Sequence, residues 1–69
     1  MEPIHVIVRG RTIAFRATAT VEGVKNEIRE SCGLQHGRLE DQDGVALVNS
    51  DSFTAGANYK FVDGIERGQ

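Results

Sequence analysis

The most regular pattern of apolar positions in this chain lies between Thr20 and Gly33. Apolar residues recur there every three or four positions, which is the spacing of one buried face on an amphipathic helix. These residues are Val21, Val24, Ile28 and Cys32. Thr20 is a favoured N-cap residue, and Gly33 suits the left-handed conformation that ends many helices. The pattern predicts a helix over this stretch, with a solvent side formed by Glu22, Lys25, Asn26, Arg29 and Glu30.

Two segments before the helix predict a β-hairpin. Residues 4–9 are rich in β-branched side chains, and residues 12–17 alternate between apolar and polar side chains. Gly10, between two arginines, supplies the turn. The side chains expected to face the core are Ile4, Val6, Val8, Ile13, Phe15 and Ala17. Because the connection to the helix is short, the helix is expected to fold back across this hairpin.

Three shorter strands are expected after the helix. Arg38–Asp41 is predicted as the third strand, with Leu39 facing the core. Asp43–Gly44 is a strong hairpin-turn signal and leads into a predicted return strand at 45–48. The alternation within residues 58–62 predicts the last strand.

The predicted order of elements is strand, strand, helix, strand, strand, strand. This ββαβββ order, with one helix packed on one face of a mixed sheet, belongs to the α+β class and is that of the ubiquitin-like β-grasp fold. Phe53, before the last strand, is expected as a core anchor. Residues 1–63 are expected to form this domain, and the polar residues 64–69 are expected to form a flexible tail.

Particular residues also resemble the ubiquitin family. The run Thr20–Lys25, followed by Ile28 and Gly33, is similar to the helix of ubiquitin, and Gly10–Ile13 resembles its first turn. The resemblance covers the whole chain as a fold and the first half as motifs. Later core positions of the family can be matched to Leu39, Gly44, Leu47, Tyr59 and Phe61. The resemblance implies a β-grasp domain that acts on other proteins, by conjugation or by noncovalent interaction.

Composition narrows the possible functions. The 69 residues include 8 basic and 10 acidic side chains, a net charge of −2, which gives no bulk attraction to nucleic acid or to an anionic membrane. Cys32 is the only cysteine, so an internal disulfide is excluded and an intracellular compartment, cytoplasmic or nuclear, is expected. No apolar run approaches the roughly 20 residues of a membrane-spanning helix.

Catalysis, metal binding and cofactors are not expected. His5 and His36 have no serine, cysteine or carboxylate partner evident in the sequence, and two histidines with one cysteine do not show zinc-ligand spacing. Conjugation in the ubiquitin family uses a terminal Gly-Gly, whereas this chain ends in Gly68-Gln69. Because this ending lacks the second glycine, a conjugated role, as a ubiquitin-like modifier or sulfur carrier, is kept as the alternative function. A Gly-Gly just past Gln69 in the reading frame would favour it.

The distribution of charge favours protein interaction. Basic residues gather on the predicted hairpin and the adjacent solvent side of the helix, namely Arg9, Arg11, Arg16, Lys25 and Arg29. Acidic residues gather in the second half, namely Glu40, Asp41, Asp43 and Asp51. We expect a non-catalytic interaction module, the N-terminal domain of a larger protein, that docks through these surfaces onto a protein partner or another copy of itself. The alternative interpretation is that these charges only solvate the surface.

Short motifs carry further resemblances within the same superfamily. Residues 39–44, followed by 50–53, resemble the acidic loop of Phox-and-Bem-type domains and the Glu-Asp-Gly loop in CIDE-N-type interaction domains of apoptotic nucleases and their inhibitors. Both resemblances imply front-to-back association, and heterologous contacts of this kind extend into chains. A basic second strand also resembles Ras-binding β-grasp domains, which add a sheet edge to a partner. That hypothesis requires the second strand to be a free edge, and its contacts would be Arg11, Arg16, Lys25 and Arg29.

Overall fold

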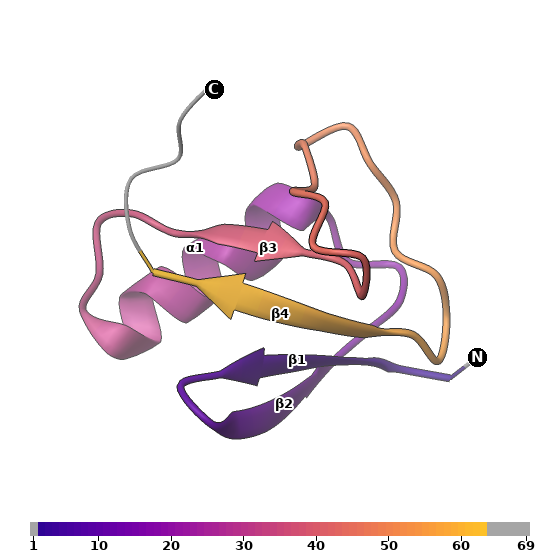
Figure 1. Ribbon diagram of the computed structural model, residues 1–69, viewed down its shortest axis with the longest axis horizontal. Helices are drawn as coiled ribbons and strands as arrows, with labels where there is room; N and C mark the ends of the chain where they lie inside the picture. The colour runs from indigo at the N-terminus through magenta and orange to yellow at the C-terminus, as the bar shows by residue number, and fades with distance from the viewer. Residues whose placement is uncertain (1, 64–69) are drawn as a thin grey trace.

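The computed structural model describes residues 2–63, which form one helix packed against a four-stranded sheet (Figure 1). The elements in chain order are β1 (Ile4–Val8), β2 (Arg11–Phe15), α1 (Val21–Cys32), β3 (Arg38–Glu40) and β4 (Asn58–Val62). The sheet order is β2-β1-β4-β3, with the central pair parallel and the two outer pairs antiparallel. The described chain is thus an α+β domain with a mixed sheet. The predicted tail, residues 64–69, lies outside the described residues.

The β1–β2 hairpin forms around a two-residue turn. Val8 pairs with Arg11, and both turn residues are left-handed, Arg9 at φ 50° and Gly10 at φ 81°. Two left-handed central residues make a type I′ turn, whose twist matches that of the flanking strands. The predicted hairpin is confirmed, although both strands end earlier than predicted.

The helix begins and ends at the predicted residues. Thr20 Oγ1 accepts the backbone N–H of Gly23 at 3.0 Å, which satisfies one of the N–H groups that a helix start leaves without an intrahelical partner. Gly33 follows the last helical residue at φ 68°, and the N–H of Leu34 bonds to the carbonyl of Arg29 at 2.8 Å. This bond and the left-handed glycine form a Schellman motif. Both predicted capping residues are confirmed.

The core lies between the helix and one face of the sheet. Its buried side chains are Ile4, Val6, Val8, Val21, Val24, Ile28, Leu39, Leu47, Phe53, Tyr59 and Phe61. The strands contribute alternate residues, as their two-residue period requires. Ile13, Phe15 and Cys32 pack against this core but stay partly exposed. The buried face predicted for the helix is confirmed at Val21, Val24 and Ile28 and only in part at Cys32, and the core position of Phe53 is confirmed.

The predicted return strand at 45–48 does not form. A single bridge joins Glu40 to Ala46. Pairing stops there because the Asp51 carboxylate accepts the N–H of Val48 at 2.9 Å and holds the chain in a turn. Val48 is 58% exposed, so the apolar residues of this run do not all pack into the core. The sheet of residues 2–63 therefore has four strands, and the five-stranded ββαβββ order is not observed.

Candidate protein interaction surfaces

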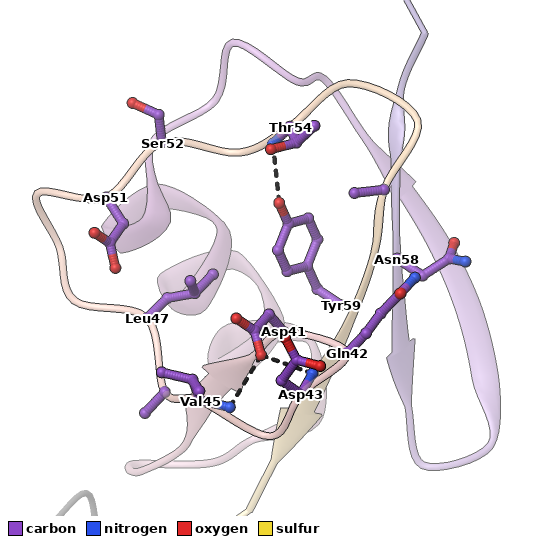
Figure 2. Close-up of a pocket in the computed structure, with 12 residues that line it drawn as sticks. Asp41, Gln42, Asp43, Val45, Leu47, Asp51, Ser52, Thr54, Asn58 and Tyr59 are labelled. Carbon is purple, nitrogen blue, oxygen red and sulfur yellow. Dashed lines mark hydrogen bonds between the residues drawn. The ribbon is translucent and has the colours of Figure 1, made fainter.

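Three of the four predicted acidic residues line one hollow in the surface. Asp41, Asp43 and Asp51 border a depression of about 520 Å³ in the connection between β3 and β4 (Figure 2). This depression, hereafter the acidic hollow, also includes Leu47 and Tyr59. Residues from two separate turns line it because residues 45–47 return beside β3 and carry the second turn back toward the first.

Two of these carboxylates also hold the loop in shape. Asp41 Oδ1 accepts the backbone N–H groups of Asp43 at 2.9 Å and of Val45 at 3.0 Å. Asp51 Oδ2 accepts the N–H of Val48 at 2.9 Å, and aspartate favours such bonds in turns. Asp43 is exposed, and within residues 2–63 its carboxylate accepts no hydrogen bond. Asp43 is therefore the carboxylate that can meet a partner without loss of the bonds that hold the loop.

Tyr59 places an aromatic ring beside the carboxylates. Its side chain is buried, and its hydroxyl oxygen accepts the N–H of Thr54 at 2.9 Å. Its ring meets Phe53 edge-on, with 5.1 Å between the ring centroids. These two contacts hold the ring in place between the Asp41 turn and Thr54 (Figure 2). The carboxylates that border the hollow attract cationic side chains, so the hollow suits a lysine or an arginine.

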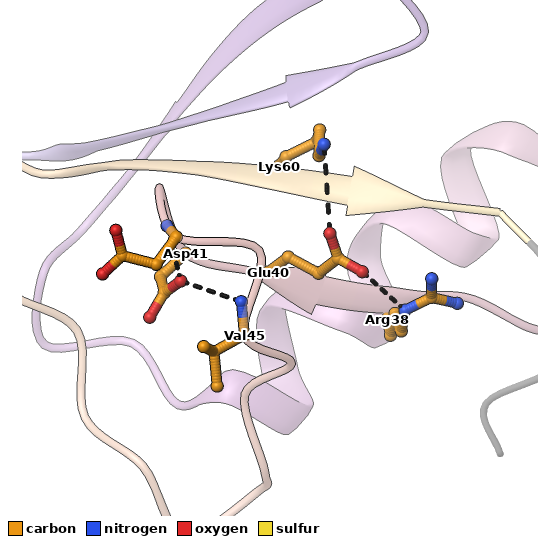
Figure 3. A network of polar contacts seen from close by, with 6 residues as sticks. Arg38, Glu40, Asp41, Val45 and Lys60 are labelled. Atoms are coloured by element: carbon orange, nitrogen blue, oxygen red, sulfur yellow. Dashed lines mark hydrogen bonds and ion pairs between the residues drawn. The ribbon is translucent and has the colours of Figure 1, made fainter. Parts of the chain in front are cut away.

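Glu40, the fourth predicted acidic residue, lies outside the acidic hollow. Its carboxylate forms ion pairs with Arg38 at 2.8 Å, on the same strand, and with Lys60 at 3.9 Å, on β4 (Figure 3). The Glu40 side chain is only 12% exposed, and Lys60 is its register partner in the sheet. Such a cross-strand pair stabilises the junction of β3 with β4. Glu40 therefore adds little negative charge to the surface.

The three arginines of the hairpin do not form one cluster. Arg9 donates from Nε and Nη2 to one carboxylate oxygen of Asp63, at 3.3 and 3.1 Å. Arg11 begins β2, whereas Arg16 follows its last residue. A separation of five residues along an extended strand corresponds to roughly 17 Å. Arg11 and Arg16 are both exposed, but they lie at opposite ends of the strand.

The predicted solvent positions of Lys25 and Arg29 are wrong. Lys25 is only 5% exposed, and Arg29 is half-buried, with its Nη2 donating to the carbonyl of Gly37 at 2.8 Å. Each follows directly after a core residue of the helix, Val24 or Ile28, so its methylene chain extends the buried face. Lys25 and Arg29 therefore do not join the hairpin arginines in one basic surface.

The two edges of the sheet differ in their cover. After β3 the chain returns along that strand, with the N–H of Leu47 bonded to the carbonyl of Leu39 at 2.8 Å. β2 has β1 on one side and, within residues 2–63, no strand on the other. The second strand is thus a free edge in the described chain, as the strand-addition hypothesis requires. The outward side of residues 11–16 is hereafter the β2 edge.

A second hollow lies at the end of the β2 edge. It measures about 500 Å³ and is lined by Pro3, Ala14, Phe15, Arg16, Ala17 and Thr18. Apart from Arg16 and Thr18 these residues are apolar, and the depression is hereafter the apolar hollow. No pattern in the sequence indicated it, because Phe15 and Ala17 were expected to be covered by the core.

Residues 2–63 contain neither a cluster of metal ligands nor a helix able to cross a membrane. Residues 2–63 contain no group of three or more histidine, cysteine, aspartate or glutamate side chains placed to hold a metal ion. Over the same residues, no helix has the length and apolar character needed to cross a membrane.

Comparison with models of known protein families, with curated proteins and with solved structures found no match for this chain. The α+β architecture rests on the structure itself, which is compatible with a small β-grasp fold. The resemblances to the ubiquitin family and to its interaction domains stay predictions.

Proposed function

We propose that this chain is a non-catalytic, ubiquitin-like interaction module that docks onto other proteins through charged surfaces. The observation that carries the proposal is the acidic hollow, where Asp41, Asp43 and Asp51 come together from two turns of one connection. The field of several carboxylates steers a partner of opposite charge and speeds its association. The expected contact is a basic side chain of a partner protein or of a second copy.

The shape of the surface supports a binding role rather than a catalytic one. The acidic and apolar hollows are both open to solvent, whereas small-molecule sites generally bury most of their ligand. The buried apolar side chains of the described chain form one core cluster. An open hollow with carboxylates at its rim suits a side chain that projects from another protein.

A second copy of the chain is one partner with the required charge. Arg11 and Arg16 lie on the β2 edge, whereas the acidic hollow follows β3, at the opposite edge of the sheet. A contact between unlike surfaces of identical molecules leaves one surface of each kind unused, so further copies can add head to tail. Arg9 is less suited to this contact, because its guanidinium is paired with Asp63.

Light scattering at several protein and salt concentrations tests the self-association. The apparent mass is expected to rise with protein concentration at low salt and to fall when added salt screens the charges. Asp43→Lys should abolish the rise and leave the fold intact, because the Asp43 side chain makes no bond that holds the loop. Glu27→Lys is the matched control, since it makes the same charge change at an exposed helix position and should leave the rise unchanged.

A basic peptide tests the case of a different partner. A blocked peptide in which arginine alternates with glycine should shift the NMR signals of Asp43, Gly44 and Tyr59. Asp43→Lys should remove these shifts, and Glu27→Lys should keep them. A strict monomer at millimolar concentration and low salt would exclude the second copy as partner. Equal binding of the peptide by the wild type and by Asp43→Lys would overturn the proposal.

A further inference from the structure

The hydrogen-bond pattern of the hairpin leaves backbone groups unpaired along the β2 edge. In a two-residue turn, the N–H of the residue after the turn bonds to the carbonyl of the residue before it, and here these register partners are Arg11 and Val8. The direction of backbone groups alternates along an antiparallel strand. The N–H and C=O groups of Thr12 and Ala14 therefore point away from β1, toward the side where residues 2–63 place no strand.

Between its two terminal arginines, the β2 edge lacks the devices that usually protect an edge strand. Natural edges are shielded by proline, by charged side chains, by bulges or by a covering segment. The four residues between Arg11 and Arg16 carry no charge and include no proline, and their register with β1 is regular. At the opposite edge, residues 45–47 return along β3. The described chain thus covers one edge and leaves the other open.

Apolar surface beside the β2 edge is only partly covered. Ile13 and Phe15 stand opposite the buried residues Val6 and Ile4, on the core side of the sheet, yet both stay partly exposed. The helix backbone lies closest to β3, at the far edge of the sheet. A strand added at the β2 edge would cover Ile13 and Phe15. The apolar hollow at the end of this edge has room for one further apolar side chain.

The charges around this edge favour an acidic occupant. Arg11 and Arg16 are exposed at its two ends, and no acidic residue lies between them. Like charges placed opposite each other destabilise paired strands. A second copy paired through the same edge in antiparallel fashion would place its Arg16 beside Arg11. An extended segment that carries carboxylates on the outer face of the sheet meets Arg16 with opposite charge. Arg16 shares that face with Thr12 and Ala14 because side chains alternate along a strand, whereas Arg11 lies on the face of Ile13.

We propose that the β2 edge binds an extended, acidic segment of a partner protein as an added strand, with one apolar side chain of that segment in the apolar hollow. Backbone bonds to Thr12 and Ala14 supply affinity, whereas Arg11, Arg16 and the hollow select the sequence. This inference rests on the proposed role of the chain as an interaction module, but it does not use the acidic hollow.

A short peptide of alternating character is the direct probe. The blocked peptide Gly-Glu-Val-Glu-Val-Glu-Gly places its valines on one face of a strand and its glutamates on the other. When this peptide binds, amide hydrogen exchange at Thr12 and Ala14 is expected to slow by at least about tenfold. The same peptide with lysine in place of glutamate should bind at least about fivefold more weakly.

Two variants separate the backbone contribution from the charge contribution. Ala14→Pro removes one outward N–H group, and because proline is tolerated on an edge strand when that N–H faces solvent, the fold should persist. A circular dichroism melt checks the fold, and peptide binding is expected to fall at least about tenfold. Arg16→Glu leaves the backbone unchanged and should reverse the preference, so that the lysine peptide binds more tightly than the glutamate peptide.

Asp43→Lys separates this inference from the proposed function. It should abolish head-to-tail association, which uses the same two arginines, and should not weaken peptide binding at the β2 edge. The inference is overturned if Thr12 and Ala14 stay unprotected at saturating peptide, or if the lysine peptide binds as well as the glutamate peptide. A dimer of the chain alone that protects the same two amides would also overturn it, because the edge would then be occupied by a second copy.

Discussion

Asp41 accepts the backbone N–H of Val45 at 3.0 Å, and this bond spans the turn that leads from β3 into the acidic hollow (Figure 3). The same oxygen accepts the N–H of Asp43 at 2.9 Å. One carboxylate therefore holds the turn and contributes negative charge to the surface. A charge reversal at Asp41 would disrupt the loop and also remove negative charge from the docking surface, so the two effects could not be separated. A charge reversal at Asp43 changes the surface charge alone.

The different roles of these neighbours predict different effects on stability. Asp41→Ala is expected to lower the free energy of unfolding by about 1–3 kcal/mol, because two backbone N–H groups lose a charged acceptor. Asp43→Ala is expected to stay within about 0.5 kcal/mol of the wild type, since it removes an exposed side chain that makes no bond. Urea denaturation measures both values. Equal losses in the two variants would contradict the structural role of Asp41.

Gly37 is predicted to tolerate no side chain. It is buried at φ 154°, and a Cβ atom there would overlap the ring of Phe61. Gly37→Ala is therefore expected to lower the free energy of unfolding by at least about 2 kcal/mol. Gly10→Ala is the matched control, because nothing lies within 4 Å of its added Cβ and only the left-handed backbone opposes it, by about 1 kcal/mol. A thermal melt that ranks the two variants the other way would contradict the packing of Phe61 on this loop.

Arg9 has two opposing effects on the stability of the fold. It occupies a left-handed position at φ 50°, which costs an ordinary residue about 1 kcal/mol, and it forms an exposed ion pair with Asp63, which contributes less than about 1 kcal/mol. Arg9→Asn should raise the stability, because Asn-Gly is a favoured type I′ turn. Arg9→Ala keeps the backbone cost and loses the ion pair, so it should lower the stability. If urea denaturation shows both variants less stable to the same extent, the ion pair outweighs the turn.

The helix and the hairpin could be predicted from the sequence because their signals are local. Thr20 and Gly33 lie at the ends of one apolar repeat, and each acts on backbone groups within a few residues of itself. The failure at 45–48 has a cause that lies just outside the apolar run, three residues after Val48. The carboxylate of Asp51 holds Val48 in a turn, and no periodicity within the apolar run reports that bond. Short apolar runs of this kind do not distinguish a strand from a loop.

Of the two candidate sites, the sequence could indicate the acidic hollow but not the β2 edge. Asp41, Asp43 and Asp51 follow one another in one connection, so their proximity could be expected from the sequence. The open β2 edge could not, because it depends on β1 pairing with the distant β4 rather than on any pattern within β2. The burial of Lys25 had a signal that was missed, since a long side chain directly after a core residue such as Val24 often packs its methylene groups on the buried face.

Paired charge reversals test whether the proposed self-association is electrostatic. Asp43→Lys alone and Arg16→Glu alone are each expected to be monomeric in light scattering, because each variant sets like charges against each other where two copies meet. A one-to-one mixture should regain a concentration-dependent mass, since the unchanged basic edge of the first variant meets the unchanged acidic hollow of the second. Asp43→Lys mixed with the wild type is the control and should shorten the assemblies by blocking their growth. A regained mass that persists at high salt would contradict the proposal, because exposed charge pairs are screened over about 8 Å at physiological ionic strength and over less as salt is added.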